Sequence, residues 1–174
     1  MHSRAASLGD AETIARIYNE GIEERIATFE TRPRTAGEIR EWFNDGHPIV
    51  VVEAGGAVIS FANTSAYSPR ECYSGVAEFS IYTAGESRGR GAGTLAMEAL
   101  ISAAEEAGIW KLTSRVFVEN VPSRKLLLSG FPRGGGPREV RQARRSVARR
   151  GGRRATHPGQ PVVPRVRMNA IFQR

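Results

Sequence analysis

Residues 88–93 of this sequence read Arg-Gly-Arg-Gly-Ala-Gly, and these residue types suit the binding of a phosphate group. Glycines let successive backbone N–H groups converge on one anion, because no Cβ atom stands in the way. An apolar periodicity predicts a helix from about Gly93, and the N-terminus of a helix carries a positive partial charge. Arg88 and Arg90 add two full positive charges nearby. The segment therefore predicts a turn that holds a diphosphate.

Two common nucleotide-binding motifs fit this turn poorly. A Walker A loop would continue with Gly-Lys-Ser or Gly-Lys-Thr, which the sequence lacks. A dinucleotide fingerprint counted from Gly89 places Thr94 at its third glycine, and counted from Gly91 it closes only in a looser form, with Ala96. A glycine-rich turn alone is as often structural as functional, so its meaning depends on the elements around it.

The hydrophobic pattern predicts the elements that must position this turn. Apolar residues at helical spacing predict a first helix over residues 10–22 with Asp10 as its cap, and Thr35 with Glu38 forms a capping box that opens a short second helix. Strands are expected over residues 2–5, 48–53, 57–67, 76–83 and 110–118, and further helices over residues 93–108 and 122–129. This order, βααβββαβα, is typical of an α/β (α+β) fold with a mostly antiparallel mixed sheet flanked by helices.

Composition divides the chain near Phe131. The length of 174 residues fits one domain. Residues 131–174 hold 12 of the 25 basic residues and one of the 18 acidic residues, Glu139, so this part carries a formal charge of +11 and the remainder −4. Arginine, glycine and proline dominate it, without apolar periodicity over residues 132–164. We therefore expect one domain over residues 1–131 and a basic, disordered tail over residues 132–174.

The cysteine, histidine and hydropathy patterns exclude several classes of protein. The single cysteine, Cys72, allows no internal disulfide, and with His2, His47 and His157 it forms no zinc-type cluster. No segment has the length and apolarity of a membrane span, and the N-terminus lacks the pattern of a signal peptide. A cytoplasmic protein with no metal and no membrane partner is the expectation.

Two motifs resemble those of a known superfamily. Arg88, Gly91 and Gly93 form Arg-x-x-Gly-x-Gly after a strand, which resembles motif A of the GNAT N-acetyltransferases, and Asn120 with Ser123 resembles their Asn-x-x-Ser segment. In that superfamily these motifs hold the pyrophosphate and the pantetheine arm of acetyl-CoA, so the resemblance implies acetyl-CoA as cosubstrate. For Ser123 the alternative is a helix cap. The residues implied in binding acetyl-CoA are Ile81, Tyr82, Thr83, Arg88, Gly89, Arg90, Gly91, Ala92, Gly93, Thr94, Asn120 and Ser123.

Four further segments narrow the resemblance, which covers about residues 3–131. They read Ile-Tyr-Asn-Glu at residues 17–20, Ala-Thr-Phe-Glu-Thr at 27–31, Arg-Glu-Cys-Tyr at 70–73 and Ala-Glu-Phe-Ser-Ile-Tyr at 77–82. These segments are similar to the phosphinothricin acetyltransferases, and Arg-Glu-Cys-Tyr is most similar to the arsinothricin branch. The resemblance implies a homodimer that acetylates the amino group of a small amino acid such as phosphinothricin or arsinothricin, which confers resistance to these compounds.

Glu78 is the candidate catalytic base. An amine is protonated at neutral pH, so acetyl transfer to nitrogen needs a group that removes a proton. Glu78 matches the glutamate proposed as general base on the family's central strand, and apolar neighbours would raise its pKa. The alternative is a surface glutamate, since alternation places it on one face with Ser80 and Tyr82. By resemblance, backbone N–H groups of residues 81–83 hold the thioester carbonyl, and no general acid for the CoA thiolate can be named.

Three residues are implied at the acceptor, which carries two anionic groups and therefore suits arginine. Arg70 is the first choice for binding an anion, Tyr73 would donate a hydrogen bond, and Phe29 would form a wall of the site. The alternatives are a solvated Arg70 and a Phe29 packed in the core.

The resemblance stops abruptly after Phe131, where the family continues with two more strands. Those strands complete the acceptor side of the site and support the dimer, so losing them would leave an exposed sheet edge and weaken both. One added base in the codons of Phe131 and Pro132 would permit a reading of residues 132–157 that resembles the missing ending. We therefore hypothesise that a shifted reading frame produced the tail.

Two other functions stay open. The acceptor of a GNAT enzyme is in other cases a different amine, such as a methionine derivative or a protein N-terminus. A third candidate is an inactive, truncated acetyltransferase whose basic tail binds nucleic acid non-specifically. The tail has no aromatic residue before Phe172 and no known reading module, so specific nucleic-acid recognition is not expected.

Overall fold

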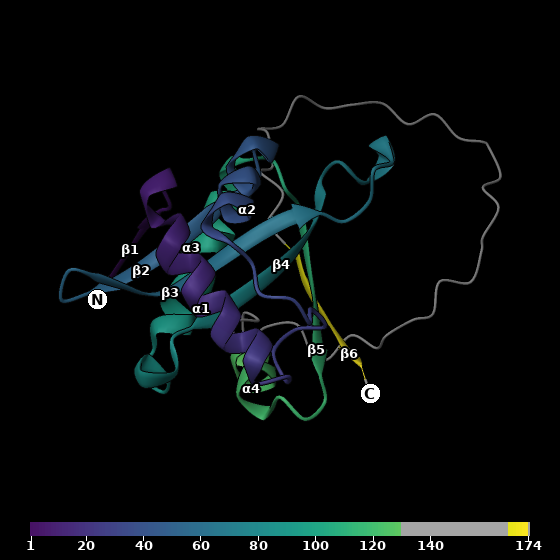
Figure 1. The fold of residues 1–174 in the computed structure, drawn as a ribbon. Helices are drawn as coiled ribbons and strands as arrows, with labels where there is room; N and C mark the ends of the chain where they lie inside the picture. The colour runs from purple at the N-terminus through teal and green to yellow at the C-terminus, as the bar shows by residue number, and fades with distance from the viewer. Residues whose placement is uncertain (130–166, 174) are drawn as a thin grey trace, which may run out of the picture.

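One mixed sheet forms the centre of the computed structural model, which describes residues 1–129 and 167–173 (Figure 1). Its strands, in spatial order, are β1 (His2–Ala5), β2 (Ile49–Ala54), β3 (Ala57–Ala66), β4 (Val76–Thr83), β5 (Lys111–Phe117) and β6 (Arg167–Gln173). β1 to β4 are antiparallel neighbours, whereas β5 runs parallel to β4 and β6 runs parallel to β5. The predicted mixed, mostly antiparallel sheet is confirmed.

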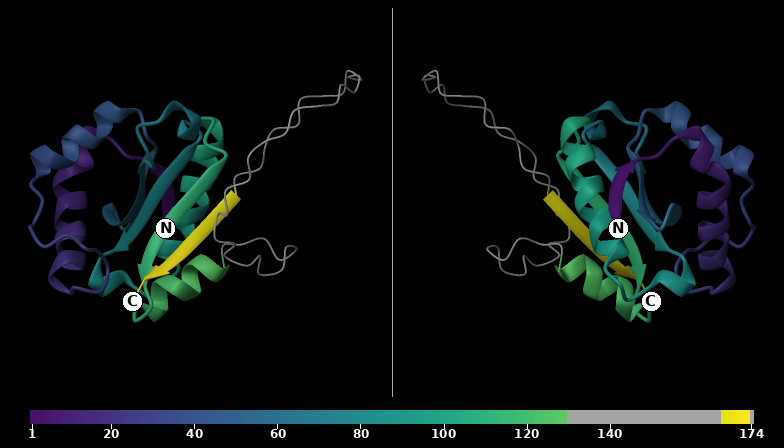
Figure 2. Two further views of the ribbon diagram at one scale, coloured as in Figure 1. Left: turned by 90° about the vertical axis from the view of Figure 1, so that its right-hand side faces the viewer. Right: turned by 90° about the vertical axis from the view of Figure 1, so that its left-hand side faces the viewer.

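Helices cover both faces of the sheet (Figure 2). α1 (Ala11–Glu23) and α2 (Ala36–Glu41) lie on one face, and α3 (Ala92–Glu106) and α4 (Val121–Ser129) lie on the other. β2 serves both faces, because Val51 packs into the cluster with α1 while Val50 and Val52 pack into the cluster with α3. A strand buried on both faces is a continuous apolar run, which explains the sequence Ile-Val-Val-Val at residues 49–52.

Local sequence signals explain two of the connections. The turn between β2 and β3 places Gly55 and Gly56 at φ values of 59° and 81°, which glycine adopts without steric cost. The capping box predicted for α2 is present, since the Thr35 side chain accepts the Glu38 N–H and the Glu38 carboxylate accepts the Thr35 N–H at 2.8 Å.

Asp10 differs from its predicted role. It precedes α1, but its side chain makes no capping hydrogen bond to that helix. Its carboxylate instead accepts the Ser7 N–H at 2.7 Å and a bidentate pair of 2.8 Å bonds from Arg4, which also bonds Glu53 on β2. Asp10 therefore joins β1 to the start of α1, because the strongest donor within its reach is the Arg4 guanidinium.

β4 and β5 separate part-way along their length. Their parallel pairing covers only three residues of each strand and ends at Glu78 and Thr113. Both strands continue beyond this point, β4 pairing with β3 on its other edge and β5 pairing with β6. The sheet is therefore opened into a wedge between its fourth and fifth strands.

β6 is built from residues of the basic tail, to which the sequence analysis assigned no strand. Its register against β5 runs from the pair Lys111 and Arg167 to the pair Phe117 and Gln173. The hypothesised change of reading frame and the missing family strands fall on residues 130–166, outside the described residues, as does most of the segment expected to be disordered.

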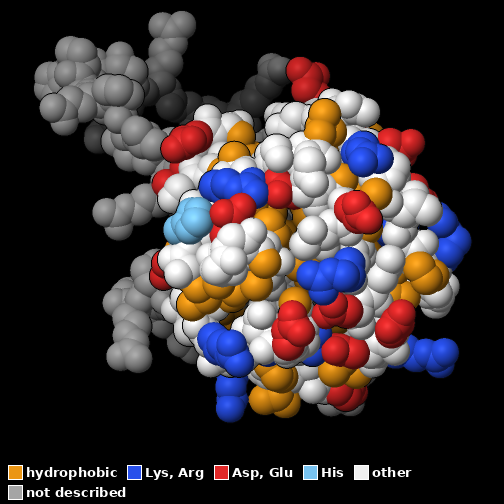
Figure 3. Space-filling model, turned by 60° about the vertical axis from the view of Figure 1, so that its left-hand side comes forward, with side chains coloured by type: hydrophobic (Ala, Val, Ile, Leu, Met, Phe, Trp, Pro, Cys, Tyr) orange, Lys and Arg blue, Asp and Glu red, His pale blue; other side chains and the backbone are white. Residues whose placement is uncertain are grey.

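Charges of both signs are mixed on one face of the molecule. The face in Figure 3 shows Lys and Arg side chains interspersed with Asp and Glu, without a single basic area. Within residues 1–129 and 167–173, no helix has the length and apolarity needed to cross a membrane. The same residues hold no group of three or more His, Cys, Asp or Glu side chains placed to bind a metal ion.

Candidate active site

The glycine-rich turn joins β4 to α3 through a short 3-10 helix, η4 (Gly85–Ser87). Gly89 and Gly91 adopt φ values of 73° and 88°, the left-handed region that favours glycine. Gly91 is the N-cap of α3 and provides no side-chain cap, and the first hydrogen bond of the helix runs from Leu95 N–H to Gly91 O. The N–H groups of Ala92, Gly93 and Thr94 therefore have no acceptor within α3, which fits the predicted diphosphate site.

The Arg88 side chain makes hydrogen bonds to the end of β4 and to the residue that follows α1. Its Nε donates to the Thr83 carbonyl at 3.0 Å, and its Nη1 donates to both carboxylate oxygens of Glu24 at 2.8 and 2.9 Å. Glu20, one turn earlier in α1, accepts the Gly85 N–H at 3.0 Å. Arg88 thus connects the end of α1 to the turn, whereas Arg90, which is also exposed, has no side-chain hydrogen-bond partner among the described residues.

A cleft with a volume of about 40 Å³ opens where β4 and β5 separate. β4 lines it with residues 79–82 and β5 with residues 114–117, and α4 contributes Leu126 and Leu127 to the lining. Ile81, Tyr82, Asn120 and Ser123 all line it, so the structure brings together residues that the sequence analysis assigned to acetyl-CoA from separate motifs.

Alternate backbone groups of β4 face this cleft. Ala84 N–H donates to Ile59 O at 2.9 Å across the antiparallel pair formed with β3. Antiparallel hydrogen bonding alternates along a strand, so even-numbered residues of β4 bond to β3 and odd-numbered residues face the opposite edge. Ile81 and Thr83 therefore direct their N–H groups toward the wedge, whereas the Tyr82 N–H is directed toward β3.

Asn120 lies at the entrance to α4 and is almost fully buried. Its Nδ2 donates to the Ile26 carbonyl at 3.0 Å, and its Oδ1 accepts the Ser123 N–H at 3.1 Å. Asn120, and not Ser123, therefore caps α4 and holds the loop after α1. Ser123 remains on the cleft wall.

Glu78 lies at the point where β4 and β5 part, and its carboxylate is paired with Arg115 of β5. Arg115 donates from Nε to one carboxylate oxygen at 2.8 Å and from Nη2 to the other at 2.5 Å. The prediction of largely apolar surroundings for Glu78 is therefore wrong, because the Arg115 guanidinium contacts its carboxylate directly. These hydrogen bonds raise the pKa of Arg115 above its ordinary value.

Aromatic side chains flank this ion pair. Phe29 is more than half exposed, which rules out core packing, and its ring lies 4.1 Å from that of Phe117, which shares a face of β5 with Arg115. Tyr67 acts electrostatically on Arg115, and its ring lies 5.5 Å from that of Tyr73. Phe29 and Tyr73, two of the three residues predicted at the acceptor, are thus each in contact with a second aromatic ring near this ion pair.

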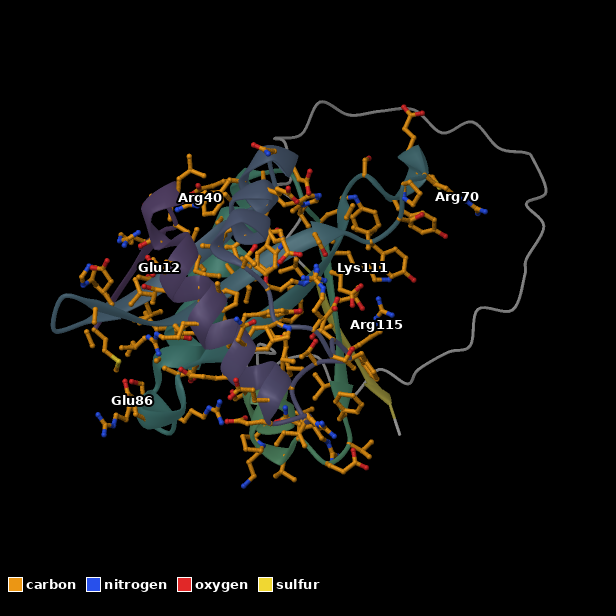
Figure 4. The ribbon with its side chains drawn as sticks, in the orientation of Figure 1. Glu12, Arg40, Arg70, Glu86, Lys111 and Arg115 are labelled. Carbon is orange, nitrogen blue, oxygen red and sulfur yellow. The ribbon has the colours of Figure 1, made fainter. Side chains whose placement is uncertain are left out.

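Arg70 is not brought to this cluster. It lies in the loop between β3 and β4 at the start of the short 3-10 helix η3 (Glu71–Tyr73), and it is exposed. Figure 4 shows its side chain pointing out from the loop, away from Lys111 and Arg115.

Arg115 is the functional candidate that the sequence analysis missed. The available signal was weak, because the predicted strand over residues 110–118 contains two charged residues, Lys111 and Arg115, and nothing in the sequence distinguishes them. The pairing of Arg115 with Glu78 depends on where β4 and β5 separate, which the sequence pattern does not contain.

Known proteins are similar to this chain in sequence and in fold. The acetyltransferase (GNAT) family matches residues 14–131. YwnH of Bacillus subtilis, named as a candidate phosphinothricin acetyltransferase, is 33% identical over 130 residues, which cover 72% of this chain and 80% of YwnH. An L-methionine sulfoximine/L-methionine sulfone acetyltransferase of Pseudomonas paraeruginosa is 29% identical over 125 residues, covering 69% of this chain and 73% of that protein.

Solved structures agree with these sequence matches. The phosphinothricin acetyltransferase of Sinorhizobium meliloti in complex with acetyl-CoA has a TM-score of 0.68 and 30% identity, covering 73% of this chain and 71% of that one. The ribosomal-protein-alanine N-acetyltransferase of Brucella melitensis has a TM-score of 0.70 and 27% identity, covering 74% and 82%. The chain therefore belongs to the GNAT acetyltransferase family, as an N-acetyltransferase related to the phosphinothricin and methionine sulfoximine enzymes.

Proposed function

We propose that this enzyme transfers an acetyl group from acetyl-CoA to the amino group of a small amino acid of the phosphinothricin or arsinothricin type. The observation that carries the proposal is the position of Glu78, beside the cleft and at the point where β4 and β5 separate. A carboxylate there lies next to the cleft, whose lining includes residues assigned to acetyl-CoA. It also lies on the face of the sheet that carries Arg115 and Phe117. The phosphinothricin acetyltransferases among its relatives support this choice of acceptor.

Each of these residues has a separate role in the proposed reaction. Acetyl-CoA supplies the thioester, its diphosphate held by the first N–H groups of α3 and by Arg90. Ile81 N–H donates to the thioester carbonyl as negative charge develops on its oxygen. Glu78 takes a proton from the acceptor ammonium. The free amine nitrogen then forms the C–N bond, the C–S bond breaks, and CoA leaves as the thiolate. The nitrogen loses its second proton to solvent, which leaves the neutral amide.

A second acceptor class comes from the other relatives. One acetylates L-methionine sulfoximine or L-methionine sulfone, and one solved neighbour is a ribosomal-protein-alanine acetyltransferase. Methionine sulfone differs from phosphinothricin in lacking a side-chain anion, and a protein N-terminus differs in lacking a free α-carboxylate.

The test measures release of CoA thiol from acetyl-CoA with phosphinothricin, methionine sulfone or a peptide with N-terminal alanine as acceptor. We expect the highest kcat/KM with phosphinothricin, and we expect Glu78→Gln to lower kcat by about 10²- to 10⁴-fold. Glu98→Gln, on the exposed side of α3, is the matched control and should leave kcat unchanged. A clear preference for the peptide would replace the proposed acceptor class, and no turnover of any amine would overturn the proposal.

The reading-frame hypothesis is tested by the same assay. A chain whose frame is restored after Phe131 is compared with the 174-residue chain. Higher turnover by the restored chain would support the hypothesis, whereas equal turnover would show that the tail is compatible with activity and would count against it.

A further inference from the structure

The Arg115 guanidinium has hydrogen-bonding capacity that the Glu78 pair leaves unused. A guanidinium carries five N–H donors. Arg115 uses Nε and one donor of Nη2 for Glu78, and its Nη1 donates to no side chain or carbonyl among the described residues. The side chain is half exposed, whereas that of Glu78 is a quarter exposed. Arg115 can therefore bind a second carboxylate without releasing the first.

The Glu78–Arg115 pair matches the charge pattern of a free α-amino acid. Such a molecule carries an ammonium and a carboxylate on the same carbon atom. A carboxylate and a guanidinium side by side present the complementary charges at comparable spacing, and a planar guanidinium binds carboxylate in two parallel hydrogen bonds. An ammonium directed at Glu78 would place the adjoining carboxylate within reach of the free Nη1 edge of Arg115.

We propose that Arg115 binds the α-carboxylate of the acceptor, so that the Glu78–Arg115 pair recognises the zwitterionic head of a free amino acid. This inference rests on the proposed function, in which Glu78 receives the ammonium proton, and it adds the group that sets acceptor specificity. Binding the α-carboxylate fixes the α-nitrogen beside Glu78 and faces it toward the wedge where Ile81 N–H points. Amines without that carboxylate, including amides and protein N-termini, lose this anchor.

The surroundings of Arg115 suit an amino acid with a short side chain. The Phe29–Phe117 pair lies at the open end of β5, and the Tyr67–Tyr73 pair lies on the loop side. These rings offer apolar walls for methylene groups on either side of the ion pair. Lys111 lies on the same face of β5 as Thr113 and Arg115, because every second residue of a strand points to the same side.

The experiment compares phosphinothricin with its α-carboxamide, in which only the α-carboxylate charge is removed. For the wild-type enzyme we expect kcat/KM to favour the free acid by about 30-fold or more, as one charge-assisted bidentate contact allows. Arg115→Gln should bring this ratio close to one, mainly by raising KM for the free acid. Arg115→Lys keeps the charge without the planar fork and should give an intermediate ratio.

Lys111→Gln is the matched control, because it removes one positive charge from the same strand and the same face without touching Glu78. Its acid-to-amide ratio should equal that of the wild type. A wild-type ratio near one, or a ratio unchanged in Arg115→Gln, would overturn the proposal. An equal loss for both acceptors in Arg115→Gln would assign the residue a structural role only, which also overturns it.

Failure of the proposed function is recognised separately. If the wild type acetylates neither compound, equilibrium binding of the free acid and of the carboxamide to the wild type and to Arg115→Gln decides the role of Arg115 alone. Tighter binding of the free acid that disappears in Arg115→Gln supports the assignment, and equal binding of both compounds to the wild type refutes it.

Discussion

Gly75 lies directly against the indole ring of Trp110. A Cβ atom at Gly75 would stand 2.0 Å from Trp110 Nε1, closer than any real contact, and the Gly75 carbonyl accepts both the Trp110 N–H at 2.9 Å and the Lys111 N–H at 3.1 Å. This contact joins the end of the β3–β4 loop to the start of β5. It therefore positions β5, and with it Arg115, relative to β4.

Gly75→Ala is expected to destabilise the fold by about 2–3 kcal/mol, because the indole or the backbone must move to admit a methyl group. Urea unfolding followed by circular dichroism measures the change. Gly37→Ala is the control, since a Cβ there meets nothing closer than Thr35 Oγ1 at 3.6 Å and Gly37 lies inside α2. That variant should gain up to about 1 kcal/mol. Equal stability of the two variants would contradict this account of Gly75.

Asp10 is predicted to make stability depend on pH. Its hydrogen bonds from Arg4 lower its pKa from 3.8 to about 2. A lowered pKa in the folded state means that the ionised form stabilises the fold above the unfolded pKa, and that this contribution is lost as pH falls through about 2. Asp10→Asn should therefore cost about 2 kcal/mol at pH 7 and little at pH 2.

Urea midpoints at the two pH values check this expectation. Glu12→Gln, an exposed carboxylate in the first turn of α1, serves as control and should change stability by less than about 0.5 kcal/mol. A loss in Asp10→Asn that is as large at pH 2 as at pH 7 would show that shape, not charge, is what Asp10 contributes.

Gly91 and Gly108 lie at opposite ends of α3 with φ values of 88° and 75°, and neither has an atom within 4 Å of an added Cβ. Alanine at either position is therefore expected to cost about 1–2 kcal/mol through backbone strain alone. Only Gly91→Ala should also weaken acetyl-CoA binding, by about 10-fold, because it reorients the first N–H groups of α3. Calorimetric titration with acetyl-CoA separates the two variants. Equal weakening in both would locate the diphosphate elsewhere.

Glu24→Gln is expected to strengthen acetyl-CoA binding by about threefold. The Glu24 carboxylate neutralises Arg88 beside the diphosphate turn, and an exposed pair of this kind is worth less than about 1 kcal/mol, so its removal costs little stability. Arg88→Gln should weaken binding in the same titration. Weaker binding in Glu24→Gln would instead mean that the ion pair is needed to hold Arg88 against the turn.

The sequence pattern predicted the parts of the site that are local in the chain. The glycine-rich turn, the helix after it and the Thr35–Glu38 capping box depend on neighbouring residues, and the structure contains each of them. The order of strands and helices through residue 129 was likewise predictable, because the spacing of apolar residues records which faces are buried, whereas β6 was not predicted.

The remaining features arise between distant segments. The pairing of β4 with β5 ends at Glu78 and Thr113, which are 35 residues apart in the sequence. The place where this pairing ends brings Arg115 into contact with Glu78. Similarly, the sequence pattern does not show that the Asn120 side chain donates to the Ile26 carbonyl, 94 residues away, while it accepts the Ser123 N–H. Spacing within a motif does not reveal which long-range partner a buried polar group bonds.

The wedge between β4 and β5 makes the hydrogen bonding of backbone N–H groups alternate along the end of β4. Tyr82 N–H is bonded within the sheet, while the N–H groups of Ile81 and Thr83 on either side of it point into the open edge. Solvent deuterium should consequently enter this central strand in alternation, quickly at residues 81 and 83 and slowly at residue 82. A strand in the middle of the molecule is thus expected to exchange like an edge strand over its last residues, until a bound thioester covers it.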